Sequence, residues 1–422
     1  MQKSDWKKCK LINETISIGD GIHGTPKYDT NSDVFFINGN NLLNGHIHIK
    51  EDTKRVSAVQ ATIHQDILSD RTLLISINGT LGNVAYYCGE PVVLGKSACY
   101  VNVNSQNDKK FFYYLFTSPM FQQYLHFEAT GTTIKNVSLK SMRNFEFLLP
   151  PVEEQKRIAQ ILGALDDKIE LLQKQNKTLE DMAKAIFKSW FVDFDVVHAK
   201  QKGLPKADIM REYHLTDELY DLFPSDFENS SLGPIPLGWQ VKPLSKIATF
   251  LNGLALQKYP AQAGEDFLPV IKIAELRNGI SSSTDKANTN LPTEYIVHNG
   301  DILFSWSGSL MVKIWSGGKG ALNQHLFKVF SNDYPKWFYF LWVNHYLPMF
   351  QEIAADKATT MGHIQRKHLD QALIVAPTDL KPFTQYFDTL IEKQILNNKQ
   401  IQTLTELRDT LLPPLISGKI RV

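Results

Sequence analysis

Apolar residues between Pro150 and Phe194 alternate at spacings of four and three positions. The series is Ile158, Leu162, Leu165, Ile169 and Leu172, then, after a gap at Asn176, Leu179, Ala183, Ile186 and Trp190. This spacing is typical of the seam of a coiled coil, whereas the apolar face of a helix in a globular domain is wider. The pattern therefore predicts a long helix over residues 151–197 and a partner helix elsewhere in the chain.

The C-terminal part of the sequence supplies the expected partner. A shift of about 225 residues superimposes the pairs Lys168/Lys393, Leu171/Leu396, Thr178/Thr403 and Leu179/Leu404. The seam predicted for a second long helix, over residues 378–422, is Phe383, Phe387, Leu390, Asn397, Leu404 and Leu411. We expect Pro413 and Pro414 to end this helix, because proline has no backbone N–H and its ring clashes with the preceding turn.

The match between the two halves continues upstream of the helices. Thr132-Thr133-Ile134 corresponds to Thr359-Thr360-Met361 at a shift of about 227 residues, and Trp6 corresponds to Trp239. The shift changes by only a few residues from segment to segment, as small loop insertions would cause. The chain is therefore interpreted as one duplicated unit, a globule followed by a long helix, with an internal pseudo-two-fold repeat.

Each predicted globule combines short strands with one helix. In residues 1–150, aromatic and β-branched runs bounded by Gly or Asn predict strands, and residues 110–129 predict a helix. In residues 239–377 the predicted strands are 267–276, 301–310, 312–318 and 326–330, before a helix over 334–355. Residues 198–238 are expected to form a polar connector with one short helix over 217–222. The predicted fold class is α+β, with two globules separated by two paired long helices.

Composition places the chain among globular proteins. The 422 residues are 43% hydrophobic and 21% charged with a net charge of +1, so binding to nucleic acid would require a local basic surface or basic partners. No apolar run suits a membrane span, and the N-terminus lacks the apolar core of a secretory signal. Cys9, Cys88 and Cys99 have neither paired nor CxxC spacing, which suits reduced thiols in the cytoplasm.

No catalytic or metal-binding motif stands out in the sequence. Gly19, Gly21 and Gly24 fit the pattern GxGxxG, but Pro26 and the turn-rich residues after it are incompatible with the helix that a dinucleotide site needs. Both Pro-Pro pairs lie at helix boundaries rather than in a methyltransferase loop, and neither a P-loop nor a nuclease-like acidic cluster is present. The histidines are scattered, which favours surface or hydrogen-bonding roles over metal ligation. The sequence therefore favours a binding protein.

Several motifs, taken in order, resemble those of a known family. They are TTIKN and TTMGHIQRK, PPVEEQKRIAQILGALDDKIELLQ, WFVDFDVV, GPIPLGWQV and the terminal LLPPLISGKIRV. Together with the duplication, they resemble the specificity subunit of type I restriction-modification enzymes over essentially the whole chain. The second helix departs from the pattern, because PTDLKPFTQYFDTLIEKQ lacks the PPVEEQKRI form of the first. This departure bears on how alike the two halves bind their partners.

The resemblance implies a division of labour between this chain and its partners. Each globule is then a target-recognition domain that reads one half of a split sequence in double-stranded DNA, and the long helices pair antiparallel. The helices dock two methylation subunits, through which restriction subunits join. S-adenosylmethionine, Mg and ATP are expected on those partners, and no cofactor is expected in this non-catalytic chain. Because the globules differ in sequence, we expect a bipartite, asymmetric target.

Base reading requires side chains with paired donors and acceptors on turns that face DNA. The candidates in the first globule are Lys27, Tyr28, Asn78, Thr80, Lys96, Thr132, Thr133, Lys135 and Asn136. Those in the second are Lys258, Tyr259, Ser307, Ser309, Gln324, Thr359, Thr360, His363, Gln365, Arg366 and Lys367. The Thr-Thr loops stand out, because both repeats place hydroxyls and a following cation ahead of the long helix. Arg366 and Lys367 are expected to contact phosphates.

The seam of the two helices also predicts a polar layer. If the helices run antiparallel, Asn176 lies opposite Asn397, and the two amides fix the register. The alternative is that Asn397 is solvated and that Ile395 and Leu396 carry the seam.

Two other functions of the chain also remain open. One is a structural adaptor whose globules bind protein, and the other is a single-chain enzyme, for which the chain is short and lacks the motifs.

Overall fold

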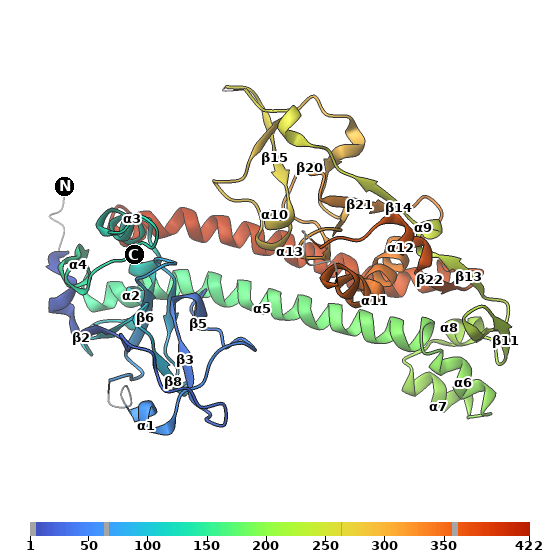
Figure 1. Cartoon of the computed structure of the whole chain (residues 1–422), viewed down its shortest axis with the longest axis horizontal. Helices are drawn as coiled ribbons and strands as arrows, with labels where there is room; N and C mark the ends of the chain where they lie inside the picture. The colour runs from blue at the N-terminus through green and yellow to red at the C-terminus, as the bar shows by residue number, and fades with distance from the viewer. Residues whose placement is uncertain (1–5, 63–66, 263, 357–361) are drawn as a thin grey trace. The chain divides into compact units, whose positions relative to one another are not determined.

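The computed structural model describes residues 6–62, 67–262, 264–356 and 362–422. The chain divides into two compact units, of which the first comprises Met1–Ile169 with Leu404–Val422 and the second comprises Glu170–Thr403. Two long helices, α5 (Val152–Phe191) and α13 (Lys381–Ile416), contribute residues to both units (Figure 1). No helix in the described ranges is long and apolar enough to cross a membrane.

The first unit is built on an antiparallel sheet with the strand order β2-β9-β6-β7. Its strands are β1 (Lys7–Lys10), β2 (Thr15–Asp20), β3 (Phe35–Ile37), β4 (Leu42–Leu43), β5 (His46–Ile47), β6 (Thr72–Ser76), β7 (Val84–Tyr86), β8 (Val92–Leu94), β9 (Ala98–Val103) and β10 (Glu146–Leu149). Its helices before α5 are α1 (Ala58–Ala61), α2 (Lys109–Thr117), α3 (Pro119–Glu128) and α4 (Leu139–Asn144). β1 pairs with β10 just before α5, and β3 pairs in parallel with β8. The mixture of strands and helices confirms the α+β class.

The second unit repeats this arrangement. Its main sheet has the order β14-β21-β18-β19, β13 pairs with β22, and the parallel pair β15–β20 gains β16 and β17 at its edges. The strands are β13 (Gln240–Pro243), β14 (Thr249–Asn252), β15 (Phe267–Ile271), β16 (Lys286–Asn288), β17 (Ile296–Val297), β18 (Ile302–Ser305), β19 (Met311–Ile314), β20 (Gly320–Leu322), β21 (Leu326–Phe330) and β22 (Leu373–Ala376). The helices between β13 and α13 are α9 (Leu244–Ile247), α10 (Ile273–Asn278), α11 (Lys336–Ala355) and α12 (Arg366–Gln371). The predicted duplication therefore extends to the order of the strands.

The helix predicted over residues 110–129 is in fact two helices, α2 and α3, which meet at Ser118. The Ser118 hydroxyl caps α3 by accepting a hydrogen bond from Phe121 N, and Pro119 occupies the first turn, where no N–H is needed. In the second repeat α11 is unbroken over residues 336–355, which correspond to 109–128 at a shift of 227. The break in the first repeat therefore follows from its Ser-Pro pair.

The strand predicted over residues 267–276 is too long. β15 ends at Ile271 and α10 begins at Ile273. The Glu275 carboxylate accepts a hydrogen bond from Lys272 N at 3.1 Å, which satisfies a donor at the helix start. A short apolar run does not by itself distinguish a strand from a strand followed by a helical turn.

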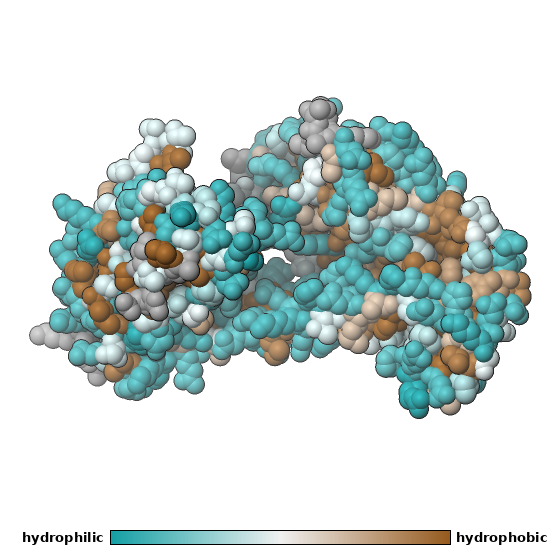
Figure 2. Space-filling view, turned by 60° about the horizontal axis from the view of Figure 1, so that its bottom comes forward, coloured by the Kyte–Doolittle hydropathy of each residue, from teal (hydrophilic) through white to brown (hydrophobic). Residues whose placement is uncertain are grey.

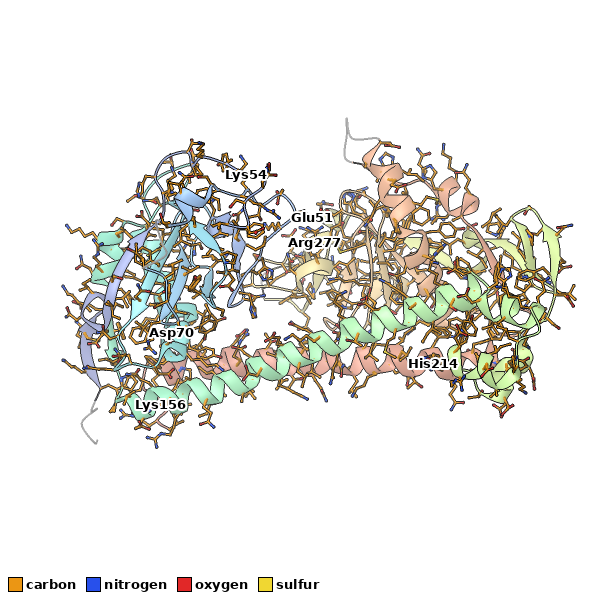
Figure 3. All side chains as sticks on the ribbon, turned by 90° about the horizontal axis from the view of Figure 1, so that it is seen from below. Glu51, Lys54, Asp70, Lys156, His214 and Arg277 are labelled. Carbon is orange, nitrogen blue, oxygen red and sulfur yellow. The ribbon has the colours of Figure 1, made fainter. Side chains whose placement is uncertain are left out.

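Helices α5 and α13 pack antiparallel within each unit. In the first unit Arg408 Nη1 donates to Asp166 Oδ1 at 2.9 Å, while the earlier Ile158 shares a core with the later Leu415. In the second unit the ring centroids of Trp190 and Phe383 lie 6.1 Å apart. Figure 3 shows the two helices side by side.

The seam residues divide into buried and half-buried groups. Those buried are Ile158, Leu162, Ile169, Leu172, Phe383, Phe387 and Asn397. Those half-buried are Leu165, Asn176, Leu179, Ile186, Leu390, Leu404 and Leu411. The sequence pattern missed Phe187 and Ile391, which are also buried. Phe187 packs edge-on against Trp342 of α11 at 5.0 Å, so α5 faces a globule there as well as its partner helix.

A layer of amides interrupts the seam. Asn397 Nδ2 donates to Asn176 Oδ1 at 2.9 Å, and Asn176 Nδ2 donates to Asn398 Oδ1 at 2.7 Å. Asn397 is fully buried, whereas Leu396 is 48% exposed. The alternative of a solvated Asn397 is therefore wrong, and the predicted amide pair is present with Asn398 as a third member.

The segment after α5 differs from the prediction. α5 ends at Phe191 rather than near residue 197, because Phe194 takes a left-handed conformation with φ of 55°. The supposed connector contains α6 (Asp195–Gln201), α7 (Lys206–Glu212), α8 (Asp217–Leu222), β11 (Phe227–Ser230) and β12 (Gly233–Pro236), of which α8 alone was predicted. Ile209, Leu219 and Phe223 are buried in the core of the second unit. A polar segment gains order by adding a few apolar residues to a neighbouring core.

Pro413 and Pro414 do not end α13, which continues to Ile416. Leu415 and Ile416 are buried in the core of the first unit, and Ser417 N donates to Pro413 O at 3.0 Å. Tertiary packing of the last turn outweighs the two N–H groups that the prolines lack. The prediction that the two prolines end this helix is therefore wrong, because they lie within its last turn.

Candidate nucleic-acid interface

Two loops of the first unit, one after β6 and one after α3, are joined edge to edge. Gly79 N donates to Lys135 O at 2.9 Å. Beside this contact, Asn78 Nδ2 donates to Asn136 Oδ1 at 3.0 Å, and both amide side chains are half-buried. The structure thus brings together residues that are far apart in the sequence and that were both candidates for base reading.

The second of these loops is closed on itself. Thr130 N donates to Asn136 O at 2.9 Å, and Asn136 N donates to Thr130 O at 2.8 Å. Gly131 has φ of 95°, and a Cβ atom there would lie 2.3 Å from Ile134 O, so this turn requires glycine. The loop exposes the side chains of Thr132, Thr133 and Lys135.

Further backbone bonds extend the same edge. Val137 N donates to Ile77 O at 2.8 Å, and Ile77 N donates to Ser97 O at 3.0 Å. Lys96 N donates to Ile22 O at 3.1 Å, and the Lys96 side chain is exposed. Segments 21–23, 95–97, 77–80 and 130–137 therefore form one row, which we call the first loop face.

The second unit repeats this row. The equivalent bonds run from Gly308 N to Gly362 O at 2.8 Å, from Ile364 N to Trp306 O at 3.0 Å, and from Gln324 N to Leu254 O at 2.9 Å. A backbone bridge also joins Ser307 to His363, at the places of Asn78 and Asn136. We call segments 253–255, 323–325, 306–309 and 362–365 the second loop face.

Different side chains occupy the second loop face. Ser307 Oγ lies 3.0 Å from His325 Nδ1, and the Trp306 ring lies 6.0 Å from the His325 ring and 6.2 Å from the His363 ring. Trp306 Nε1 donates to Asn252 Oδ1 at 2.9 Å. The sequence analysis missed Trp306, His325 and Asn252. The alignment of SWSG with SING of the first repeat was the available signal for Trp306.

Lys27 and Tyr28 lie on another loop of the first unit. Lys27 N donates to Gln60 Oε1 at 2.7 Å, and Lys54, labelled in Figure 3, lies 4.5 Å from the centre of the Tyr28 ring. Both candidate side chains are exposed, as is Thr80 on the first loop face. Thr80 directly follows Gly79, which bonds to Lys135 in the row, whereas Lys27 and Tyr28 lie outside the row.

The remaining candidates of the second unit have mixed positions. Lys258 and Ser309 are exposed, and Gln324 is half-buried. Tyr259 packs against a small apolar cluster around Leu256, which gives it a structural role. Thr359 and Thr360 lie outside the described residues.

The start of α12 carries the last three candidates. Gln365 N donates to His368 Nδ1 at 3.1 Å, which caps the helix. Arg366 Nη2 donates to Phe250 O at 3.2 Å, with its guanidinium 5.9 Å from the Phe327 ring. Lys367 is exposed. Arg366 thus ties α12 to β14, and Lys367 is left as the better candidate for a phosphate contact.

In the part of the chain that the structure describes, the reactive side chains considered below do not assemble into a recognisable catalytic site. Burial raises the pKa of the Cys9 thiol to about 12 and also raises the pKa of Cys99, so both remain neutral and weakly nucleophilic. His325 Nε2 faces Gln324 Nε2 at 3.4 Å, where a hydrolytic triad would need a carboxylate. Among the described residues, no group of three His, Cys, Asp or Glu side chains could hold a metal ion.

The duplicated arrangement of a globule followed by a long helix agrees with the family comparison. The model of the type I restriction modification DNA specificity domain matches the chain twice, at residues 9–181 and 236–406. The chain therefore belongs to the family of type I restriction-modification specificity subunits, which recognise DNA and are not themselves enzymes.

Relatives of similar length support this assignment. The type I restriction enzyme MjaIX specificity subunit of Methanocaldococcus jannaschii is 27% identical over 433 residues, which cover 99% of this chain and 94% of the relative. The HindI specificity subunit of Haemophilus influenzae is 26% identical over 335 residues, covering 69% and 73%. The solved S subunit of a type I restriction-modification system from M. genitalium has a TM-score of 0.51 at 15% identity, covering 99% of this chain and 97% of that one, and thus shares the fold.

Proposed function

We propose that the chain reads a bipartite, asymmetric target in double-stranded DNA, one half with each loop face. The observation that carries this proposal is the row of bonded segments that recurs in both units with different side chains. Asn78 and Asn136 occupy the places that Ser307 and His363 occupy in the second unit. Because equivalent backbone bonds hold the two loop faces, we expect both faces to meet DNA in the same way. Because the faces carry different donors and acceptors, we expect them to read different bases.

Exposed cations on and beside the loop faces suit the DNA backbone. Lys96 and Lys135 lie on the first face, and Lys367 lies two residues beyond the end of the second. Because the net charge of the chain is only +1, phosphate contacts made by this chain require local groups such as these lysines. The proposal therefore assigns affinity to these lysines and sequence preference to the polar groups between them.

The proposal includes two methylation subunits docked on the long helices. Leu171 and Leu396 are repeat equivalents and are 49% and 48% exposed, and Met182 and Leu407 are equivalents that are 44% and 45% exposed. On the face of the molecule that Figure 2 shows, most of the surface is hydrophilic and hydrophobic residues form smaller groups. Large apolar side chains exposed at the same places in both repeats favour two copies of one partner. S-adenosylmethionine, Mg and ATP would then be bound by methylation and restriction subunits.

Selection from randomised duplexes tests the proposal. The full chain is assembled with its methylation subunits, and bound DNA is sequenced. We expect one split motif with unlike halves, and methylation mapping should show the same motif. A palindromic motif, or enrichment of none, would overturn the proposal. Stable assembly with the partners but no enrichment would instead support a structural adaptor.

A further inference from the structure

We propose that the amide pair Asn78–Asn136 reads an adenine through the major groove in the first half of the target. This inference rests on the proposed function and adds the base class that one loop face recognises. It starts from the single hydrogen bond between the two side chains, 3.0 Å from Asn78 Nδ2 to Asn136 Oδ1.

The shared hydrogen bond leaves a defined set of groups for a ligand. Once Asn78 donates one N–H to Asn136, the pair retains the carbonyl oxygen of Asn78 as an acceptor, and it retains the amino group of Asn136 and the second N–H of Asn78 as donors. None of these groups has a hydrogen-bond partner among the residues that the structure describes. The pair therefore offers a ligand one free carbonyl acceptor together with free amide donors.

This set matches one base better than the others. Adenine shows a donor, N6, next to an acceptor, N7, in the major groove, whereas guanine shows two acceptors. Cytosine offers only a donor and thymine only an acceptor on that edge. Among the four bases, only adenine can therefore use both the free acceptor and a free donor of the pair, as it does with a single Asn or Gln side chain elsewhere.

The hydrogen bond between the two side-chain amides is not needed to close the loops, which argues against a purely structural role for the pair. In the second unit the corresponding loops are held by Gly308 N to Gly362 O at 2.8 Å and by the Ser307–His363 backbone bridge, without an amide pair. The first unit has its own backbone bond from Gly79 to Lys135. Because the backbone already fixes both asparagines, little conformational entropy is lost when they bind a base.

Two isosteric substitutions test the inference, Asn78→Asp and Asn136→Asp. In either variant one remaining amide donates to the new carboxylate, so that the pair gains a second free acceptor and loses donors. Both variants should therefore lose the preference for adenine at one and the same position of the first half-site, by about fivefold to 150-fold, and should favour cytosine there. The second half-site should not change. Asn13→Asp, at an exposed site of the same unit outside the loop face, is the matched control.

The readout is duplex selection by the full chain assembled with its methylation subunits, with the melting temperature of each variant. If either Asp variant unfolds, Asn136→Ala adds no charge and should relax the same position to no preference. The adenine assignment would be overturned by an unchanged motif in both variants. It would also be overturned by an equal loss of affinity at every position together with a lower melting temperature. In both cases a split motif selected by the wild type would still support the proposed function. A wild type that selects no split motif would overturn both.

Discussion

In the first repeat Gly79 N bonds to Lys135 O, and in the second repeat Gly308 N bonds to Gly362 O, at 2.9 and 2.8 Å. Backbone groups make these contacts, so the side chains along the row can change without loss of the frame. They have changed from a pair of amides to a hydroxyl beside imidazole rings. The duplication has preserved how the loops are held and has varied what they present.

At the starts of the two long helices, by contrast, the interactions that hold the chain in place differ between the repeats. Gln155 is 1% exposed, and its Nε2 donates to Asn107 Oδ1 at 3.0 Å and to Pro150 O at 2.9 Å. Its Oε1 accepts a hydrogen bond from Asp108 N at 2.9 Å. This side chain clamps the start of α5 to the start of α2.

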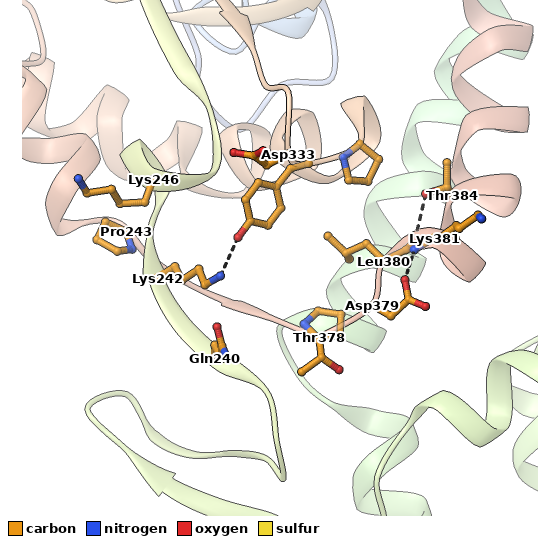
Figure 4. Close-up of a pocket in the computed structure, with 13 residues that line it drawn as sticks. Gln240, Lys242, Pro243, Lys246, Asp333, Thr378, Asp379, Leu380, Lys381 and Thr384 are labelled. Atoms are coloured by element: carbon orange, nitrogen blue, oxygen red, sulfur yellow. Dashed lines mark hydrogen bonds between the residues drawn. The ribbon is translucent and has the colours of Figure 1, made fainter.

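The second repeat has lost the whole clamp. Tyr334, Pro335 and Pro382 stand at the places of Asn107, Asp108 and Gln155, and Pro335 has no N–H to donate. A hollow of about 940 Å³ lies beside the start of α13, and Lys242 Nζ donates to Tyr334 Oη there at 2.8 Å (Figure 4). A partner that contacts both helix starts must therefore meet different chemistry at each.

The largest expected effect comes from replacing a whole globule. Exchanging residues 1–150 for the matching domain of a relative should change one half of the selected DNA motif completely and leave the other half unchanged, because each loop face belongs to one unit. Methylation mapping of cells that carry the hybrid provides the measurement. A change in both halves, or in neither, would show that the repeats do not read independently.

The exposed leucines test whether the repeats bind partners alike. Leu171→Asp and Leu396→Asp should each weaken the docking of one methylation subunit by about tenfold or more, because burying a carboxylate replaces the burial of an apolar side chain. Sedimentation of the complex should show the loss of one copy in each variant. Gln173→Asp places the same charge on an exposed site of α5 as a control. Unchanged stoichiometry in both variants would remove this surface from the proposed interface.

The Gln155 clamp should matter for stability. Gln155→Ala leaves Asp108 N and the two acceptors of the clamp buried without a partner, and we expect a loss of about 1–3 kcal/mol in the free energy of unfolding. Denaturant unfolding of the full chain measures this loss. Gln160→Ala, on the exposed side of the same helix, should change the stability by less than about 0.5 kcal/mol. Equal effects of the two substitutions would argue against the clamp.

The amide layer should lower stability while fixing the register. Asn397 Oδ1 is buried without a hydrogen-bond partner in the described part of the chain, a cost of about 1–3 kcal/mol. Changing Asn176 and Asn397 together to Leu should raise the melting temperature and loosen the half-site spacing that the assembled complex accepts, because a slip of one heptad moves a helix by roughly 10 Å. Unchanged melting and unchanged spacing would contradict this role.

Much of the fold could be predicted from the sequence because local patterns of residues determine it. The heptad spacing predicted the first long helix, and the internal repeat predicted the second and the facing of Asn176 and Asn397. The β21 and α11 segments followed from their composition. The errors fall where tertiary packing overrides local preference. Leu415 and Ile416 carry α13 past two prolines, and the segment after Phe191 folds because its apolar residues enter a neighbouring core.

The candidate site was only partly predictable. Asn78 and Asn136 could be named as polar residues on turns, but their hydrogen bond joins loops 58 residues apart and depends on how β6 and α3 are placed. Trp306 lay within a predicted strand and His325 was one of the scattered histidines, so neither was named as a candidate for base reading. Arg366 was expected on phosphate because no local pattern reveals that its guanidinium reaches the carbonyl of Phe250.

The smallest expected effect distinguishes a lysine that contacts a DNA phosphate from an arginine that stabilises the fold, both at the start of α12. Lys140 and Lys367 are exposed and equivalent in the two repeats, on α4 and α12. Lys140→Ala and Lys367→Ala should each weaken binding to all sequences alike and flatten the dependence of log K on log salt by about 0.9, the contribution of one phosphate contact. Titrations of a fixed duplex at several salt concentrations measure this slope.

The neighbouring arginines provide the contrast. Arg366 donates to Phe250 O on β14, and in the first repeat Arg143 Nη2 donates to Ile18 O on β2 at 2.8 Å, so each repeat ties this short helix to its sheet with an arginine from a different turn. Arg366→Ala and Arg143→Ala should therefore lower the free energy of unfolding by about 1 kcal/mol and leave the salt slope unchanged. A flatter slope in Arg366→Ala with unaltered stability would return this arginine to the DNA backbone and make the second repeat the more strongly anchored of the two.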